Sequence, residues 1–275
     1  VFLAYGILAI AAYMAIGAGC DYSKMSVLEP RLWTVWGRYT AFNMLPLFLV
    51  YFLSFSYAFL IAWGNGYFKW FGVVNCALLC LDIIWQQCRS AYPAVIAGIS
   101  FVHYFKSKKV LVIALSLVLA VIVGLSAASP GFRAQIAEYG DMNQWDNRLP
   151  LFNSALRMFA ERPVAGTGIG MFEKLIRTAK YEPPPDYMPM YRDFFIHTHN
   201  FYLETLAEMG ILDAAFFIAI FAVFFVRLAK AVRRITDDTI RTFLIGLGSI
   251  IAVYLVFGIT LSIITVGLNE SSMFW

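Results

Sequence analysis

Long apolar runs separated by short polar stretches dominate this chain. Several of the runs approach the roughly 20 residues that a helix needs to cross a bilayer. They cover residues 1–19, 41–63, 68–85, 91–105, 110–128, 211–226 and 243–266. Only one polar segment is large, and it follows the fifth run. The pattern predicts an all-α fold, a polytopic transmembrane bundle of about seven helices with one large helical extracytoplasmic loop.

The same pattern divides the chain into three parts. Residues 1–128 hold the first five predicted helices, residues 129–208 the loop domain, and residues 209–275 the last two helices. The chain opens inside an apolar run and ends at Met273-Phe274-Trp275, which reads as the approach to another span. We therefore expect a fragment of a longer protein, with further spans at both ends.

Composition excludes a soluble domain of this size. Of the 275 residues, 61% are hydrophobic and only 14% are charged. The cysteines show no CxxC spacing and mostly lie in or near apolar runs, so we expect packing roles and no metal site. They are Cys20, Cys76, Cys80 and Cys88.

The basic residues orient the predicted helices. They gather in two short loops, which the positive-inside rule places in the cytoplasm. The first loop holds Lys106, Lys108 and Lys109, and the second holds Arg227, Lys230, Arg233, Arg234 and Arg241. The large polar segment then faces outside, and by the same count so do the linker at residues 20–40 and the loop of Arg89.

The outer segment contains a predicted amphipathic helix and a glycine-rich turn. The helix covers residues 147–161, with Leu149, Phe152, Leu156 and Phe159 at helical spacing, and Pro163 ends it. The run Gly166-Thr167-Gly168-Ile169-Gly170 has no preceding strand and no following Gly-Lys-Ser/Thr, so we reject a nucleotide-binding loop. It predicts a tight backbone turn close to the membrane or substrate.

The stretch His197-Thr198-His199-Asn200 closes the outer segment, and an apolar run follows it. Asn200 is placed to cap the next helix with its short side chain. The free N–H groups and the dipole of that helix bias a nearby histidine towards its neutral, proton-accepting form, and they also suit a phosphate. A helix cap with two surface histidines explains the stretch equally well.

Cations and carboxylates near the predicted outer face are further candidates. Arg89 lies at a membrane boundary, where Asp82 and Gln86 can share its helix face, and a structural ion pair with Asp82 is the alternative to substrate binding. Arg148 opens the outer helix, where arginine is unfavourable unless an anion lies nearby. Glu204 and Glu208 stand one turn apart after His199, either to orient an imidazole, to pair with arginine, or as a solvated face.

Taken together, these motifs resemble the O-antigen ligase and polymerase superfamily of bacterial envelope membranes. The resemblance covers roughly residues 89–210, and Asp213 stands where the family commonly has a second glycine. Its carriers are Cys88-Arg89-Ser90-Ala91, Asn147-Arg148-Leu149, the run from Arg162 to Phe172, and His199-Asn200 followed by Glu208-Met209-Gly210-Ile211-Leu212.

The resemblance implies an inverting glycosyltransferase of the bacterial inner membrane that works without a metal or cofactor. The donor would be a glycan on undecaprenyl diphosphate and the acceptor a sugar hydroxyl of the lipid A core, with the active site on the periplasmic face. Fixed cations stabilise a departing diphosphate, and a hydroxyl nucleophile needs a base. We assign His199 as the base and Arg89 and Arg148 to the diphosphate; further contacts are expected from His197, Asn200, Glu204 and Arg38.

Other functions remain open at this point. A polysaccharide polymerase or a protein oligosaccharide ligase of the same superfamily would differ in its acceptor, which the sequence does not reveal. A membrane transporter would carry ionisable residues near the bilayer midplane, whereas here only Asp82 lies inside a predicted span. A purely structural subunit would not need Arg89, Arg148 and His199 on one side.

Overall fold

The computed structural model describes residues 44–62, 66–86, 88, 90–128, 148–183 and 197–260. Within these ranges every regular element is a helix and no strand occurs, in agreement with the all-α prediction. The predicted run at residues 1–19, the linker at 20–40 with Arg38, the position of Arg89 and the proline-rich residues 184–186 lie outside the described ranges.

The other apolar runs form helices. The first four keep nearly the predicted boundaries, whereas the predicted run 211–226 lies within a helix at 201–234, and the run 243–266 begins its helix at 238 and leaves it at 257. The helices are α2 (Met44–Ala62), α3 (Tyr67–Gln86), α4 (Ala91–Lys106), α5 (Lys108–Ala128), α10 (Phe201–Arg234) and α11 (Asp238–Phe257). Among the described residues, α10 and α11 are long and apolar enough to cross a membrane by length and composition. Helix α10 begins ahead of its predicted apolar run because its first turns belong to the polar outer segment.

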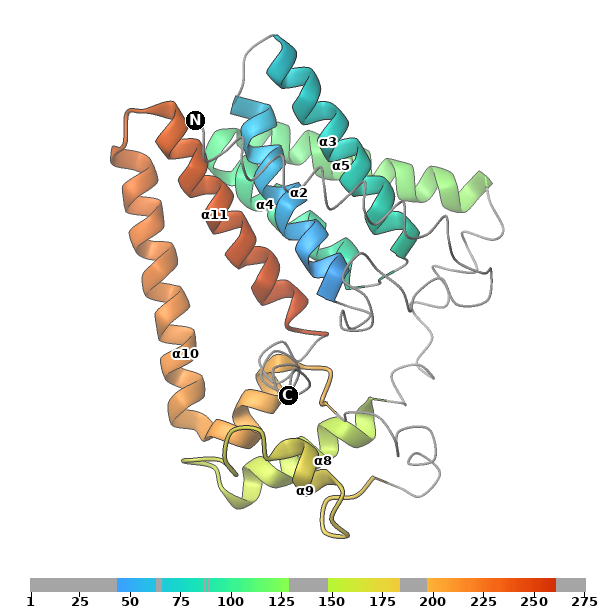
Figure 1. Ribbon diagram of the computed structural model, residues 1–275, viewed down its shortest axis with the longest axis vertical. Coiled ribbons are helices and arrows are strands. Elements are labelled where there is room, and N and C mark those ends of the chain that lie inside the picture. Colours follow the sequence, from blue (N-terminus) through green and yellow to red (C-terminus); the bar gives the residue numbers. More distant parts are fainter. Residues whose placement is uncertain are drawn as a thin grey trace, which may run out of the picture. The chain divides into compact units, whose positions relative to one another are not determined.

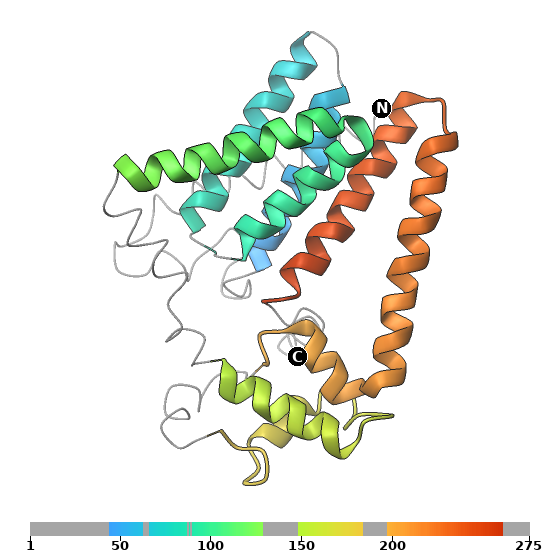
Figure 2. The same cartoon turned by 180° about the vertical axis from the view of Figure 1, so that it is seen from behind.

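The chain divides into two compact units, and the first contains most of the apolar helices. It comprises α2, α3, α4, α5 as far as Gly124, and residues Phe225–Phe257. Helix α2 contacts α3, α4 and α11, and α11 also contacts α4, as the two opposite views show (Figures 1 and 2). Phe55 and Phe59 of α2 are buried there and pack against Phe243 and Ile250 of α11.

Small residues let these helices approach closely. A Cβ atom on Gly246 would lie 2.7 Å from Cδ2 of the Phe55 ring, and one on Gly98 would lie 2.1 Å from Oγ of Ser54. Because glycine has no side chain, the neighbouring helix can pack directly against its backbone at such contacts. This is typical of helices in membranes. The contact between α2 and α11 therefore depends on Gly246.

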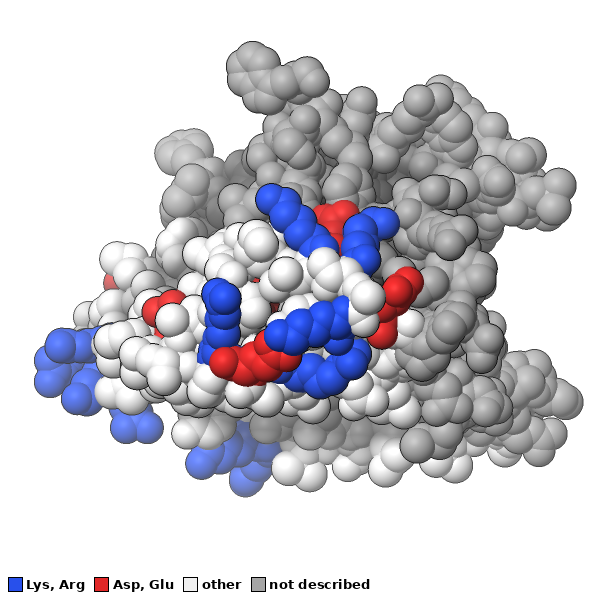
Figure 3. All heavy atoms as spheres, turned by 90° about the horizontal axis from the view of Figure 1, so that it is seen from below, with Lys and Arg blue, Asp and Glu red and all other residues white. Residues whose placement is uncertain are grey.

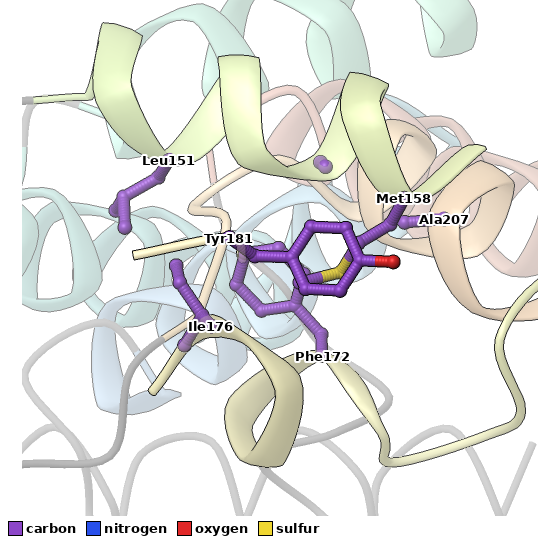
Figure 4. Close-up of a cluster of buried hydrophobic side chains, with 7 residues drawn as sticks. Leu151, Met158, Phe172, Ile176, Tyr181 and Ala207 are labelled. Carbon is purple, nitrogen blue, oxygen red and sulfur yellow. The ribbon is translucent and has the colours of Figure 1, made fainter. Parts of the chain in front are cut away.

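The second unit is a small helical lobe built from the outer segment. It contains α8 (Leu149–Glu161), α9 (Phe172–Ile176), α10 as far as Phe224, and the turn at residues 258–260. Its core is one cluster of buried side chains from α8, α9, the loop after α9 and α10, shown in Figure 4. The cluster comprises Leu151, Ala155, Met158, Phe172, Ile176, Tyr181 and Ala207.

Helix α8 ends at Glu161 as predicted, but the two leucines named at helical spacing do not lie in the core. Leu149 and Leu156 are 43% and 46% exposed, whereas Leu151, Ser154, Ala155 and Met158 are buried. The small Ser154 and Ala155 leave room for Tyr181, and the Ser154 hydroxyl donates a hydrogen bond to the Tyr181 carbonyl at 2.7 Å. Because that hydroxyl has a partner, a polar residue can occupy the core while two leucines stay outside it.

Charges of both signs lie next to one another on the face of the molecule shown in Figure 3. Within the lobe, Glu161 accepts hydrogen bonds from Lys180 and from the Tyr181 hydroxyl, and these bonds lower its pKa. Arg177 pairs with Glu173 across one turn at 3.6 Å. The acidic and basic residues of this lobe thus form specific ion pairs.

We predict that Gly246→Ala destabilises the protein by about 1–3 kcal/mol, because the added methyl group must displace the Phe55 ring. Gly124→Ala is the matched control, since a Cβ there meets nothing within 4 Å and alanine favours a helix. Thermal unfolding of both variants in the same detergent measures the difference. Equal melting temperatures for the two variants would contradict the packing account.

Candidate functional site

The histidine segment is fixed at the start of α10 by the cap that the sequence predicts. The Asn200 side chain accepts a hydrogen bond from the Leu203 N–H through Oδ1 at 3.0 Å. Its Nδ2 donates to the Ile259 carbonyl at 3.1 Å, and the Phe201 N–H donates to the Gly258 carbonyl at 2.8 Å. The first residues of α10 are therefore tied to the turn that follows α11, and the cap prediction is confirmed.

A buried carboxylate holds the residue between the two histidines. Glu204 is 3% exposed and Thr198 is fully buried. One oxygen of Glu204, Oε2, lies 3.1 Å from the Thr198 backbone nitrogen and 2.9 Å from its Oγ1. The Thr198 Oγ1 also accepts from the Asn200 N–H at 3.1 Å. Glu204 is therefore not a solvent-exposed charge. Its buried carboxylate accepts hydrogen bonds that fix the backbone of the histidine segment.

His199 has an unusual backbone conformation. Among the described residues other than glycine, it alone has a positive φ, of 53°. The left-handed region costs a side-chain-bearing residue about 1–2 kcal/mol and persists only where the surroundings impose it. The buried Nδ1 of His199 has no hydrogen-bond partner within the part of the chain that the structure describes.

Both histidines are held in the neutral form. The pKa of His199 is lowered from 6.5 to about 4, chiefly by burial, with smaller contributions from Arg148 and His197. Burial also lowers the pKa of His197, while Glu173 opposes the change. Both shifts favour the neutral imidazole, as predicted from sequence, and desolvation is the largest cause of each.

Arg148 supplies the cation of this site. It occupies the position just before α8 and makes no side-chain cap to that helix. Its charge acts on His199, so the guanidinium lies within electrostatic reach of the imidazole. A guanidinium beside a neutral imidazole combines an anion-binding group with a proton acceptor.

The glycine-rich run forms the predicted turn. It hydrogen-bonds to the C-terminal end of the first part of α10, which runs from Phe201 to a break at Gly210. The Thr167 N–H donates to the Ala207 carbonyl at 3.0 Å, and the Gly168 N–H donates to the Glu208 carbonyl at 2.8 Å. These bonds satisfy two carbonyls that the helix leaves without partners where it breaks. The break itself is at Gly210, where φ is 75° and ψ is −173°.

Glu208 reinforces this loop from inside. The residue is 5% exposed, and its two oxygens accept from the Gly170 N–H at 2.9 Å and the Phe172 N–H at 2.8 Å. Burial raises the pKa of the carboxyl group, and the backbone N–H groups oppose this change. Glu208 therefore holds the glycine loop, just as Glu204 holds the histidine segment.

Five of the residues singled out from sequence lie together in this lobe: Arg148, His197, His199, Asn200 and Glu204. Arg89 and Arg38 lie outside the described residues, so their roles stay predictions. Sequence reasoning missed Thr198 and Glu173. An acidic residue in the first turn of α10 was a usable signal for the Thr198 contact, whereas nothing in the sequence links Glu173 to His197.

No cluster of three or more metal-ligating side chains occurs in the described ranges. A family model described as O-antigen ligase matches residues 74–218 of the chain, more than half of its length. The match includes Arg148, the glycine loop and the histidine segment. Among curated proteins, no sequence matches the chain.

We predict that Gly210→Ala destabilises the lobe more than Gly170→Ala does. Both positions have positive φ, but a Cβ on Gly210 would lie 2.3 Å from the Val164 carbonyl oxygen, whereas one on Gly170 meets nothing within 4 Å. Conformational strain alone costs about 1–2 kcal/mol, and the clash adds to it at Gly210. Thermal unfolding of the two variants checks this order, and the reverse order would refute the close contact between Gly210 and the Val164 carbonyl.

We also predict that His199 makes stability depend on pH in a defined window. The pKa is lower in the folded protein, so the unfolded chain binds more protons between about pH 6.5 and 4. Stability is therefore retained above pH 6.5 and falls as the pH drops towards 4. His199→Gln should flatten this part of a plot of melting temperature against pH. An unchanged slope would show that His199 titrates normally.

Proposed function

Because the chain belongs to the O-antigen ligase family (Wzy_C), we propose that it is an inverting membrane glycosyltransferase that transfers a glycan from undecaprenyl diphosphate to a sugar hydroxyl of the lipid A core. Membership implies membrane embedding, ligase- or polymerase-like transfer, and lipid-linked glycans as substrates. The identity of the acceptor, inversion at the anomeric carbon, the location in the inner membrane and an active site on the periplasmic face are parts of this proposal. The observation that carries it is a buried, neutral His199 beside the charge of Arg148.

The proposed reaction is a single displacement at the anomeric carbon. His199 takes the proton of the acceptor hydroxyl as its oxygen forms the new glycosidic bond. The bond between the anomeric carbon and the diphosphate oxygen breaks, and undecaprenyl diphosphate leaves with the electron pair. Negative charge grows on that diphosphate, so a cation fixed beside it stabilises the transition state more than the ground state.

In this scheme Arg148 binds the diphosphate. Arg89 contributes a second cation to the same group, as predicted from the sequence motif. Such an anion also acts on the base. Its negative charge offsets the effects of burial and of Arg148 on His199, which raises the pKa of the imidazole towards the range where a general base works best. Donor binding would thereby prepare the base for the acceptor hydroxyl.

His197 and Glu173 suit a supporting role. The two side chains interact electrostatically, and His197 in turn acts on His199. A neutral His197 can donate to or accept from a sugar hydroxyl. We assign it to the acceptor side of the site, while Asn200 and Glu204 are occupied with fixing the backbone.

We predict that His199→Ala lowers the transfer rate by about 10²–10⁴-fold, because the acceptor loses its base. The purified protein is given lipid-linked glycan as donor, with lipid A core in one reaction and a second lipid-linked repeat unit in another. Product on the core alone supports a ligase, and product on the repeat unit supports a polymerase. A near-normal rate for a correctly folded His199→Ala protein would remove His199 from the role of base.

The matched test of the cation uses Arg148→Ala, Arg148→Lys and a control, Lys174→Ala, which removes an exposed charge from the neighbouring helix α9. We expect weaker use of the donor in both Arg148 variants, with partial recovery by lysine, since an ammonium cannot contact phosphate in two places at once. The Lys174 variant should behave as wild type. Equal donor affinity in all four proteins would exclude Arg148 from the diphosphate site.

A further inference from the structure

The ring of His199 is not held by a hydrogen bond of its own at Nδ1. In many catalytic histidines one ring nitrogen donates to a carboxylate or carbonyl, which fixes the ring for the work of the other nitrogen. Here Nδ1 is buried without a partner within the described ranges. Among the described contacts, the direction of the imidazole therefore depends on the backbone that carries it.

That backbone is fixed on both sides of His199. On one side, Thr198 is bound by Glu204 through both its N–H and its hydroxyl. On the other, Asn200 caps α10 and donates its own N–H to Thr198 Oγ1. These four bonds close a tight turn, and His199 at its tip has φ of 53°.

We propose that Glu204 is a positioning residue for His199, acting through Thr198 to hold the imidazole in the turn from which it meets the acceptor hydroxyl. This inference rests on the proposed function, since it gives His199 the role of base. Glu204 is suited to this task because it is 3% exposed and lies in the first turn of a helix.

A charged acceptor matters for this arrangement. Hydrogen bonds to a carboxylate are roughly twice as strong as those between neutral groups. A buried carboxylate also needs its donors, and Thr198 supplies its N–H and a hydroxyl that is shared between Glu204 at 2.9 Å and the Asn200 carbonyl at 2.7 Å. The left-handed conformation of His199 is thus maintained by a group that would lose its own hydrogen bonds if the turn relaxed.

The test compares Glu204→Gln with Glu208→Gln in the purified membrane protein. Glu208 is the matched control, because it is an equally buried carboxylate one turn further along α10 that holds the glycine loop instead. A second pair, Thr198→Val and Thr198→Ser, removes the hydroxyl or keeps it. The chain has three histidines, so isotope-labelled histidine gives three ring signals, which single His→Gln variants assign.

We expect Glu204→Gln and Thr198→Val to shift the His199 signal and to raise its titration midpoint, because the ring leaves its buried position. The transfer rate at saturating donor should fall by about 10–100-fold with the donor KM nearly unchanged, since the defect is one of orientation. Thr198→Ser should keep the wild-type signal and rate. Glu208→Gln should leave the His199 signal in place even where it lowers the melting temperature.

An unchanged His199 signal in both Glu204→Gln and Thr198→Val would overturn the positioning role, whatever the activity. Equal changes in the Glu204 and Glu208 variants would also overturn it, because they would show a general loss of packing. If Glu204→Gln fails to fold, the Thr198 pair decides by the same criteria. If the wild-type protein shows no transfer, the proposed function is refuted. The ring signals of His199 would still show whether Glu204 positions this side chain.

Discussion

The lobe depends on two buried carboxylates that stand one turn apart in the short helix between Asn200 and the break at Gly210. Glu204 holds the histidine segment that enters this helix, and Glu208 holds the glycine loop that wraps its other end. Each carboxylate accepts bonds from backbone N–H groups, which is how a buried charge avoids its desolvation cost. Further bonds, from the Thr167 and Gly168 N–H groups to the Ala207 and Glu208 carbonyls, join the glycine loop to the same helix.

This arrangement explains why a polar, glycine-rich outer segment adjoins an apolar helix. The break at Gly210 ends the polar helix, and the Ile211 N–H that opens the apolar part donates to the Pro163 carbonyl at 2.8 Å. The same break leaves the Ala207 and Glu208 carbonyls to the glycine loop. The chain thus passes from the site into the apolar helix without leaving these backbone groups unpaired, as a low-dielectric surrounding requires.

Much of this could be predicted from sequence because the signals are local. The lengths of the apolar runs predicted the helices. The position of Asn200 before an apolar run predicted the cap, and the glycines after Pro163 predicted the turn. The buried face of α8 could not be predicted, because Ser154 is buried through a bond to the distant Tyr181 carbonyl. For the same reason, spacing alone did not show that Glu204 and Glu208 bind loop backbone, or that burial is the largest cause of the lowered pKa of His199.

The central claim is that His199 is a buried, neutral base prepared by an anion bound beside it. The most direct measurement is the titration of the labelled His199 ring with and without undecaprenyl diphosphate in the purified protein. The account predicts a pKa near 4 in the free protein and a rise of about one unit or more when the lipid diphosphate binds. A pKa that stays unchanged at saturating lipid would contradict it.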